Sequence, residues 1–118
     1  MIKVLLVDHV DDDVRDVVDD ARATMQVLLL TDSTVGADAA VRGSDAVDGV
    51  VSGAELGLAR PDPDLFSAIA LREGLLLGEL AVVDSAPEMI AAAEMLGIRS
   101  HLYAGRAGLR EFVAGLSG

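Results

Sequence analysis

The chain has 118 residues, with 20 acidic and 9 basic side chains and a formal net charge of −11. This length suits one domain with its own hydrophobic core, and a hydrophobic fraction of 52% excludes a disordered chain. The negative charge opposes binding to nucleic acid and to anionic membrane surfaces. Because the chain contains no cysteine, disulfides and thiolate zinc sites are excluded as well.

Short apolar runs predict the strands. The first run, at residues 4–7, is too short for a signal peptide or a membrane helix, so we expect a cytoplasmic protein. Four later runs have the same character, and continuous apolar strands are typical of a parallel sheet covered on both faces. We therefore predict strands buried on both faces at residues 4–7, 27–30, 49–51, 80–83 and 98–103.

Helical patterns separate these runs. They are marked by an apolar stripe at residues 14–21, by Asp62 and Pro63 ahead of 65–69, by Pro87 ahead of 90–93, and by a last stripe at 109–116. Gly74 and Gly97 follow two of them, as expected at helix ends. The alternation predicts a three-layer α/β/α sandwich around a five-stranded parallel Rossmann-like sheet. We expect it to form a single domain at residues 1–118, without a cap domain.

Polar residues follow the predicted strands where ligands bind in such sheets, beyond the carboxyl ends. Asp8 and Asp84 each follow a strand, and Thr31 and Ser33 lie at the end of another. Hard oxygen ligands of this kind suit a divalent cation. Each aspartate has a structural alternative, because an Asp after a strand often caps the next helix. For Asp84 that helix is the one beginning at Pro87.

Four segments together resemble the motifs of the haloacid dehalogenase-like (HAD) superfamily, in the order and spacing of that family. They are residues 4–8, 28–32, 57–66 and 81–98, and the third contains Arg60-Pro61-Asp62-Pro63. The resemblance implies that Asp8 is a nucleophile that forms an aspartyl-phosphate. It also implies that Thr31 and Arg60 hold phosphoryl oxygens. Mg²⁺ would be bound by Asp8, the backbone carbonyl of Val10 and Asp84, and the substrate would be a small phosphorylated molecule.

The departures from the family pattern are as informative as the matches. Val10 stands where the family's phosphatases have an aspartate that acts as general acid and base. Losing such a group lowers the reaction rate by about 10²–10⁴-fold. Arg60 replaces a lysine, and Ser85 replaces a second acid of the fourth motif. The stretch after Asp8 is too short for the family's usual flap or cap. We therefore expect weak or lost phosphatase activity. Val10 and the missing cap also argue against dehalogenation.

Other residues near Asp8 offer alternatives for the missing acid. His9 is a candidate stand-in base, although its side chain should point away from that of Asp8 if strand geometry persists. The run at residues 11–13 is expected to be a solvated helix start, with the alternative that Asp11 or Asp12 replaces the missing acid. His101 is expected in the last strand, in a structural role.

Two different readings of the whole chain stay open at this point. A response-regulator receiver domain has a similar opening, but it needs an Asp where this chain has Ser52, and a Lys after the fifth strand, whereas Lys3 is the only lysine. Alternatively, the chain is a non-enzymatic interaction domain that keeps the HAD fold and binds a protein partner. Metal binding would distinguish the enzyme from the interaction domain.

Overall fold

The computed structural model describes residues 1–31, 46–58 and 62–116. Strands lie at all five predicted positions: β1 (Val4–Val7), β2 (Gln26–Thr31), β3 (Gly49–Ser52), β4 (Leu80–Asp84) and β5 (Arg99–Leu102). The described helices are α1 (Arg15–Arg22), α3 (Asp64–Glu73), α4 (Pro87–Met95) and α5 (Arg106–Leu116), with a short 3₁₀ helix, η1 (Leu77–Glu79). The predicted order of strands and helices is confirmed over the described residues.

The sheet is entirely parallel, in the order β3-β2-β1-β4-β5. The central strand β1 pairs with β2 on one side and with β4 on the other, so that Val7 lies opposite both Leu29 and Val83. The family resemblance requires this arrangement. A receiver domain would place its second and third strands beside the first, and that reading is therefore rejected.

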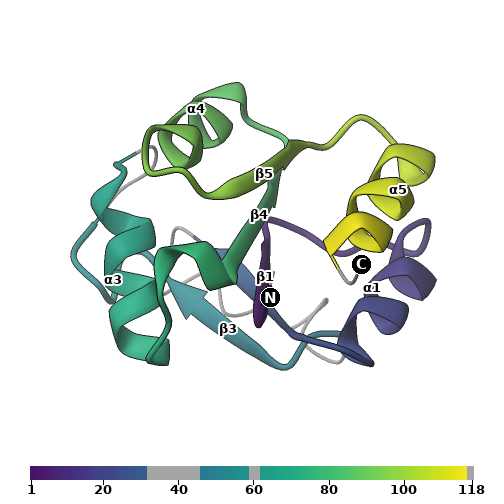
Figure 1. Cartoon of the computed structure of the whole chain (residues 1–118), viewed down its shortest axis with the longest axis horizontal. Coiled ribbons are helices and arrows are strands. Elements are labelled where there is room, and N and C mark those ends of the chain that lie inside the picture. The colour runs from purple at the N-terminus through teal and green to yellow at the C-terminus, as the bar shows by residue number, and fades with distance from the viewer. Residues whose placement is uncertain (32–45, 59–61, 117–118) are drawn as a thin grey trace.

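Helices cover both faces of the sheet, with α1 and α5 on one side and α3 and α4 on the other (Figure 1). Side chains of β1 alternate between the two layers. Leu5 and Val7 pack with α1 and α5, whereas Val4 and Leu6 pack with α3 and α4. All four are buried. The apolar runs therefore fill two cores at once, as expected for a covered parallel sheet.

The two edge strands differ from the prediction that every strand is buried on both faces. In β3, Val50 is 37% exposed, and in β5, Leu102 is 42% exposed and Arg99 is also exposed. Each of these strands pairs with a neighbour on one side only, so it lies at the margin of the layers. The prediction was wrong for β3 and β5 because an apolar run does not reveal how many neighbours a strand has.

Helix ends follow the expected chemistry, with one shift. Gly74 ends α3 with a φ of 70°, and Gly97 follows α4 with a φ of 72°, a region that favours glycine. Pro63 precedes α3 rather than forming its first turn, and Asp62 Oδ1 accepts a hydrogen bond from Asp64 N at 2.9 Å. Among the described residues, no helix has the length and apolar character needed to span a bilayer.

Candidate functional site

The candidate site lies at the carboxyl ends of β1 and β4, the two central strands. Asp8 directly follows Val7, and Asp84 directly follows Val83, and these two valines are paired in the sheet. Asp8 and Asp84 are therefore neighbours in the register. Asp84, which lies inside β4, has the parity of Val82 and so belongs to the α3 and α4 side of the sheet. That both carboxylates bind one cation stays a prediction.

The carboxylate of Asp8 receives a hydrogen bond on each oxygen. Ser85 N donates to Oδ2 at 3.2 Å, and His9 Nδ1 lies 2.9 Å from Oδ1. The side chain of Asp8 is 14% exposed. Two donors on two oxygens restrict rotation of the carboxylate, so that Asp8 is held in one orientation while still reachable from solvent.

The contact between His9 and Asp8 corrects the expectation that these side chains point apart. That expectation required strand geometry to continue through residue 9, but β1 ends at Val7. Beyond the strand the backbone turns, and the imidazole folds back onto the neighbouring carboxylate. Its Nε2 also lies 3.8 Å from Asp11 Oδ2.

Asp84 is almost completely buried, with 2% of its surface exposed. Its Oδ1 accepts a hydrogen bond from Ala86 N at 2.9 Å, in the turn that leads into α4. This contact supports the structural role considered for Asp84 at the start of that helix. It does not conflict with a metal role, because a carboxylate oxygen has more than one lone pair.

By the family resemblance, Val10 stands where HAD phosphatases have their proton donor. Its side chain is partly buried and packs against the core between the sheet and α1 and α5. An isopropyl group cannot transfer a proton, whereas its burial contributes to packing. The residue thus belongs to the hydrophobic core, and only its backbone carbonyl is a possible metal ligand.

Thr31 ends β2 one strand away from Asp8, and Ser52 lies opposite it at the end of β3. The backbone carbonyl of Thr31 accepts a hydrogen bond from Gly53 N at 2.9 Å. A Cβ on Gly53 would lie 2.9 Å from the carbonyl oxygen of Leu58, so only glycine fits there without a shift of the loop. Thr31 is half-buried. Arg60, Asp32 and Ser33 lie outside the described residues.

The acidic run after Val10 is exposed, as predicted. Asp11 Oδ1 accepts a hydrogen bond from Asp13 N at 3.1 Å, which forms a turn ahead of α1. This local role agrees with the solvated helix start. Among the described residues, no hydrogen bond joins Asp11 or Asp12 to Asp8.

Tyr103 joins the site, although the family resemblance gave it no role there. It directly follows β5, and its ring meets that of His9 edge-on, with centroids 5.2 Å apart at an interplanar angle of 87°. Burial, and then the negative charges of Asp11, Asp13 and Asp8, raise the pKa of the Tyr103 phenol above its usual value of 10.0. The phenol therefore stays protonated at neutral pH. The signal in the sequence that points to Tyr103 is its place at the end of the predicted strand at residues 98–103.

His101 lies in β5, as predicted, one residue before the strand ends at Leu102. Its ring stacks on that of Phe112 in α5, with centroids 5.2 Å apart at 18°. Its Nε2 is buried and has no hydrogen-bond partner among the described residues. These contacts fit a packing role between β5 and α5.

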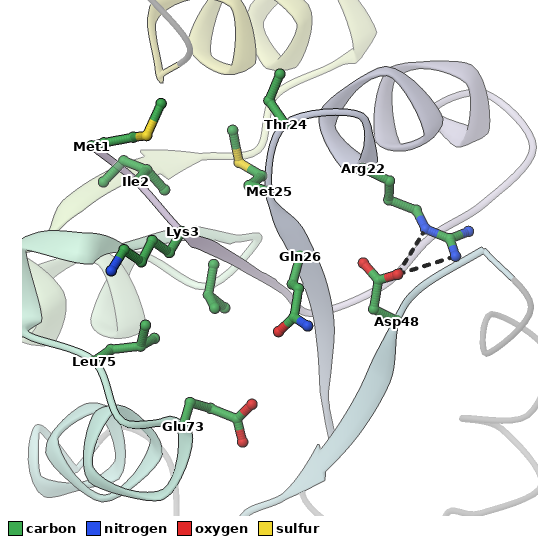
Figure 2. A pocket seen from close by; sticks show the side chains of 11 residues that line it. Met1, Ile2, Lys3, Arg22, Thr24, Met25, Gln26, Asp48, Glu73 and Leu75 are labelled. Atoms are coloured by element: carbon green, nitrogen blue, oxygen red, sulfur yellow. Dashed lines mark hydrogen bonds and ion pairs between the residues drawn. The ribbon is translucent and has the colours of Figure 1, made fainter.

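A pocket of about 460 Å³ opens at the opposite, amino ends of β1 and β2 (Figure 2). Its walls include Ile2, Lys3, Met25 and Gln26. Figure 2 shows Arg22 and Asp48 joined across its rim. Ligands of open parallel sheets bind at the carboxyl ends. We therefore assign the candidate site to Asp8 and its neighbours, and not to this hollow.

Solved structures share this fold. An uncharacterized protein from Corynebacterium glutamicum matches with a TM-score of 0.82 and 21% identity, over 98% of this chain and 95% of that one. A HAD-family enzyme from Bacteroides thetaiotaomicron, in complex with magnesium and inorganic phosphate, matches with a TM-score of 0.66 and 19% identity, over 76% of this chain and 50% of the enzyme. A predicted HAD-like hydrolase from Porphyromonas gingivalis matches with a TM-score of 0.68 and 21% identity, over 82% and 52% of the respective chains.

At the level of sequence, no protein-family model and no curated protein matches the chain. The chain spans about half of the length of the two HAD proteins. The match covers the shared core and does not extend to the rest of those proteins. The sheet order, the helices on each face and these structural matches agree with one another. The chain therefore has the core fold of the haloacid dehalogenase-like superfamily.

Proposed function

We propose that the chain is a slow phosphatase of the HAD type, which uses Asp8 as its nucleophile and acts on phosphate compounds with good leaving groups. The observation that carries this proposal is the placement of Asp8. It follows the central strand of a HAD-like sheet, and its carboxylate is oriented by two hydrogen bonds. A fixed and partly accessible carboxylate is suited to in-line attack on phosphorus.

The reaction would proceed in two steps. A carboxylate oxygen of Asp8 attacks phosphorus, the bond to the leaving oxygen breaks, and the leaving group departs with the electron pair. Water then attacks the aspartyl-phosphate, releases inorganic phosphate and restores the carboxylate, and its proton passes to solvent. Thr31 and Arg60 are proposed to hold the phosphoryl oxygens during both steps.

The substrate class follows from Val10. With an apolar side chain in place of the general acid, the leaving group must depart without being protonated. Acyl phosphates and aryl phosphates meet this condition, whereas alkyl phosphates do not. We therefore propose a small acyl or aryl phosphate as the substrate.

The donor set at the site is compatible with Mg²⁺, which binds the enzyme from Bacteroides thetaiotaomicron. Within residues 1–31, 46–58 and 62–116, no three His, Asp or Glu side chains gather at one point. Mg²⁺ usually takes only one or two carboxylates and completes its octahedron with water and substrate oxygens. Asp8, Asp84 and the carbonyl of Val10 are such a set. When bound, the ion would offset the charge between carboxylate and phosphate, which matters in a chain of net charge −11.

Release of phosphate from acetyl phosphate and p-nitrophenyl phosphate, with and without Mg²⁺, tests the proposal. We expect slow, Mg²⁺-dependent release by the wild type and only background release by Asp8→Asn. Asp19→Asn is the matched control, because it removes the same charge from an exposed position on α1. Calorimetry should show Mg²⁺ binding by the wild type and weaker binding by Asp8→Asn and Asp84→Asn. If the wild type shows neither metal-dependent heat nor release above Asp8→Asn, the non-enzymatic interaction domain becomes the leading function.

A further inference from the structure

The neighbour of the proposed nucleophile makes a contact that the family pattern does not assign. His9 Nδ1 lies 2.9 Å from Asp8 Oδ1. An ionised carboxylate only accepts hydrogen bonds, so Nδ1 must carry the hydrogen. Nδ1 carries a hydrogen in the protonated imidazole and in one of the two neutral tautomers. The contact therefore forms whether His9 is charged or neutral. When His9 is neutral, the contact requires the tautomer that carries the hydrogen on Nδ1.

The ring of His9, whose side chain is 40% exposed, makes a second contact. It meets the ring of Tyr103 edge-on, and the backbone N–H of Tyr103 donates to the carbonyl of Asp84 at 2.9 Å. Tyr103 also packs against the core beside α1 and α5. His9 thus lies between the end of β1 and a residue anchored to the end of β4.

The second donor to Asp8 is weaker in geometry. Ser85 N lies 3.2 Å from Oδ2, and Ser85 is exposed. With this bond alone, the carboxylate would keep one anchored oxygen and turn more freely about its last torsion. The bond from His9 is the shorter of the two, and it fixes the other oxygen.

We infer that His9 is a positioning residue, whose Nδ1–H group holds the carboxylate of Asp8 in the orientation required for attack. This inference rests on the proposed role of Asp8 as nucleophile. It assigns no proton transfer to His9. The chain thus orients its nucleophile with a side chain from the adjacent residue. At this site Ser85 stands in place of an acid, and Val10 cannot transfer a proton.

Three variants at one position separate this role from others. In His9→Asn, the side-chain amide nitrogen lies close to the place of Nδ1, whereas in His9→Gln it lies close to the place of Nε2. His9→Ala has no donor. A hydrogen bond to a charged group corresponds to about 10- to 100-fold in rate. We expect kcat for acetyl phosphate to fall by about that factor in His9→Ala and His9→Gln, with KM little changed, and to recover most of the loss in His9→Asn.

A spectroscopic measurement tests the contact without any turnover. The chain has two histidines, so ¹⁵N imidazole spectra of the wild type and His9→Asn assign the signals of His9 directly. We expect neutral His9 to be the Nδ1–H tautomer, and we expect Asp8→Ala to shift it toward the commoner Nε2–H form.

The outcomes separate the two claims. If the wild type releases phosphate no faster than Asp8→Asn, the proposed function is wrong and this inference falls with it. If Asp8→Asn is inactive while His9→Ala matches the wild type, the inference alone is wrong. It is also overturned if His9→Asn is as slow as His9→Ala, or if neutral His9 is the Nε2–H tautomer.

Discussion

The two ends of the sheet differ in what their polar groups do. At the amino ends, Asp48 accepts hydrogen bonds from Val27 N at 2.7 Å and from Arg22, and Lys3 pairs with Glu79 at 2.8 Å. These contacts tie strands, turns and helix ends together around a hollow. At the carboxyl ends, Asp8 is oriented by two donors that come from loops and not from the sheet ladder.

Among the described residues, the pocket and the candidate site thus lie at opposite ends of the sheet. The hollow at the amino ends is bordered by charges that already have structural partners. The carboxyl ends carry a carboxylate whose orientation is controlled but whose side chain is still reachable. Changes at the carboxyl ends should therefore alter activity more than stability, and changes at the amino ends should do the reverse.

The largest effect is expected from Val10→Asp, which restores a carboxylate where the family's phosphatases have their general acid. Turnover of an alkyl phosphate should rise by about 10²-fold, the lower end of general acid–base effects, and turnover of p-nitrophenyl phosphate should rise less. Because Val10 packs against the core, the change should also cost about 1–2 kcal/mol in the free energy of unfolding. Steady-state kinetics and urea denaturation measure the two effects.

Adding Ser85→Asp should increase turnover further through the metal site, and the two changes should couple because both act on one site. Val10→Asn is the control, since it introduces a polar group of similar size without an acid. If Val10→Asp and the double variant fold, bind Mg²⁺ and stay inactive, the site at the carboxyl ends has no phosphatase function.

Asp48→Ala tests the amino ends. The buried N–H of Val27 would lose its acceptor, and Arg22 would lose its contact with Asp48. We expect the free energy of unfolding to fall by about 2 kcal/mol, without a change in kcat or KM at temperatures where the variant is folded. Asp48→Asn should lose less, because its amide oxygen can still accept from Val27.

Asp20→Ala, on the exposed face of α1, is the control for Asp48→Ala. It measures how the loss of an exposed carboxylate changes the free energy of unfolding and kcat of this acidic chain. A fall in kcat for folded Asp48→Ala would show that the two ends of the sheet are coupled and that activity does not depend on the carboxyl ends alone.

The smallest effect is expected from Asp16→Asn, which removes an exposed contact between α1 and α5. Asp16 in α1 pairs with Arg106 and Arg110 of α5. The hydrogen bond from Arg106 is the main reason why the pKa of Asp16 lies below its usual 3.8. Because the folded-state pKa is lowered, the stabilisation is fully present above pH 3.8 and is lost as the pH falls through the lowered pKa.

The melting temperature of Asp16→Asn should therefore lie slightly below that of the wild type at neutral pH. This difference should shrink in strong salt and disappear in acid. A difference that persists unchanged at low pH would assign the effect to packing between α1 and α5 and not to the ion pairs.

Much of the fold could be predicted from the sequence because its central strands are unusually uniform. The runs in β1, β2 and β4 are apolar on both sides, so only a covered parallel sheet accommodates them. The adjacency of Asp8 and Asp84 followed from the strand order that the family resemblance implied, and not from the apolar runs. The burial of β3 and β5 could not be predicted, since it depends on their place at the sheet edges.

The details of the site were less accessible from the sequence. The position of the His9 side chain depends on β1 ending at Val7, and strand ends are uncertain by more than one residue from patterns alone. The contact of Tyr103 with His9 requires the path of the chain after β5, far from residue 9 in the sequence. Such tertiary contacts leave no local signal in composition or periodicity.

The pairing of β1 with β4 also affects how the chain acquires its site. The hydrogen bond from Ser85 to Asp8 joins residues 77 positions apart, so the loop to be closed includes β2, β3 and α3. Long loops of this kind slow folding, because their closure entropy is lost before the contacts form. During synthesis, β1 emerges first and keeps an unpaired edge until β4 follows it. An interrupted chain that stops before Leu80 would carry Asp8 on an exposed strand edge, where pairing with another chain competes with completion of the sheet.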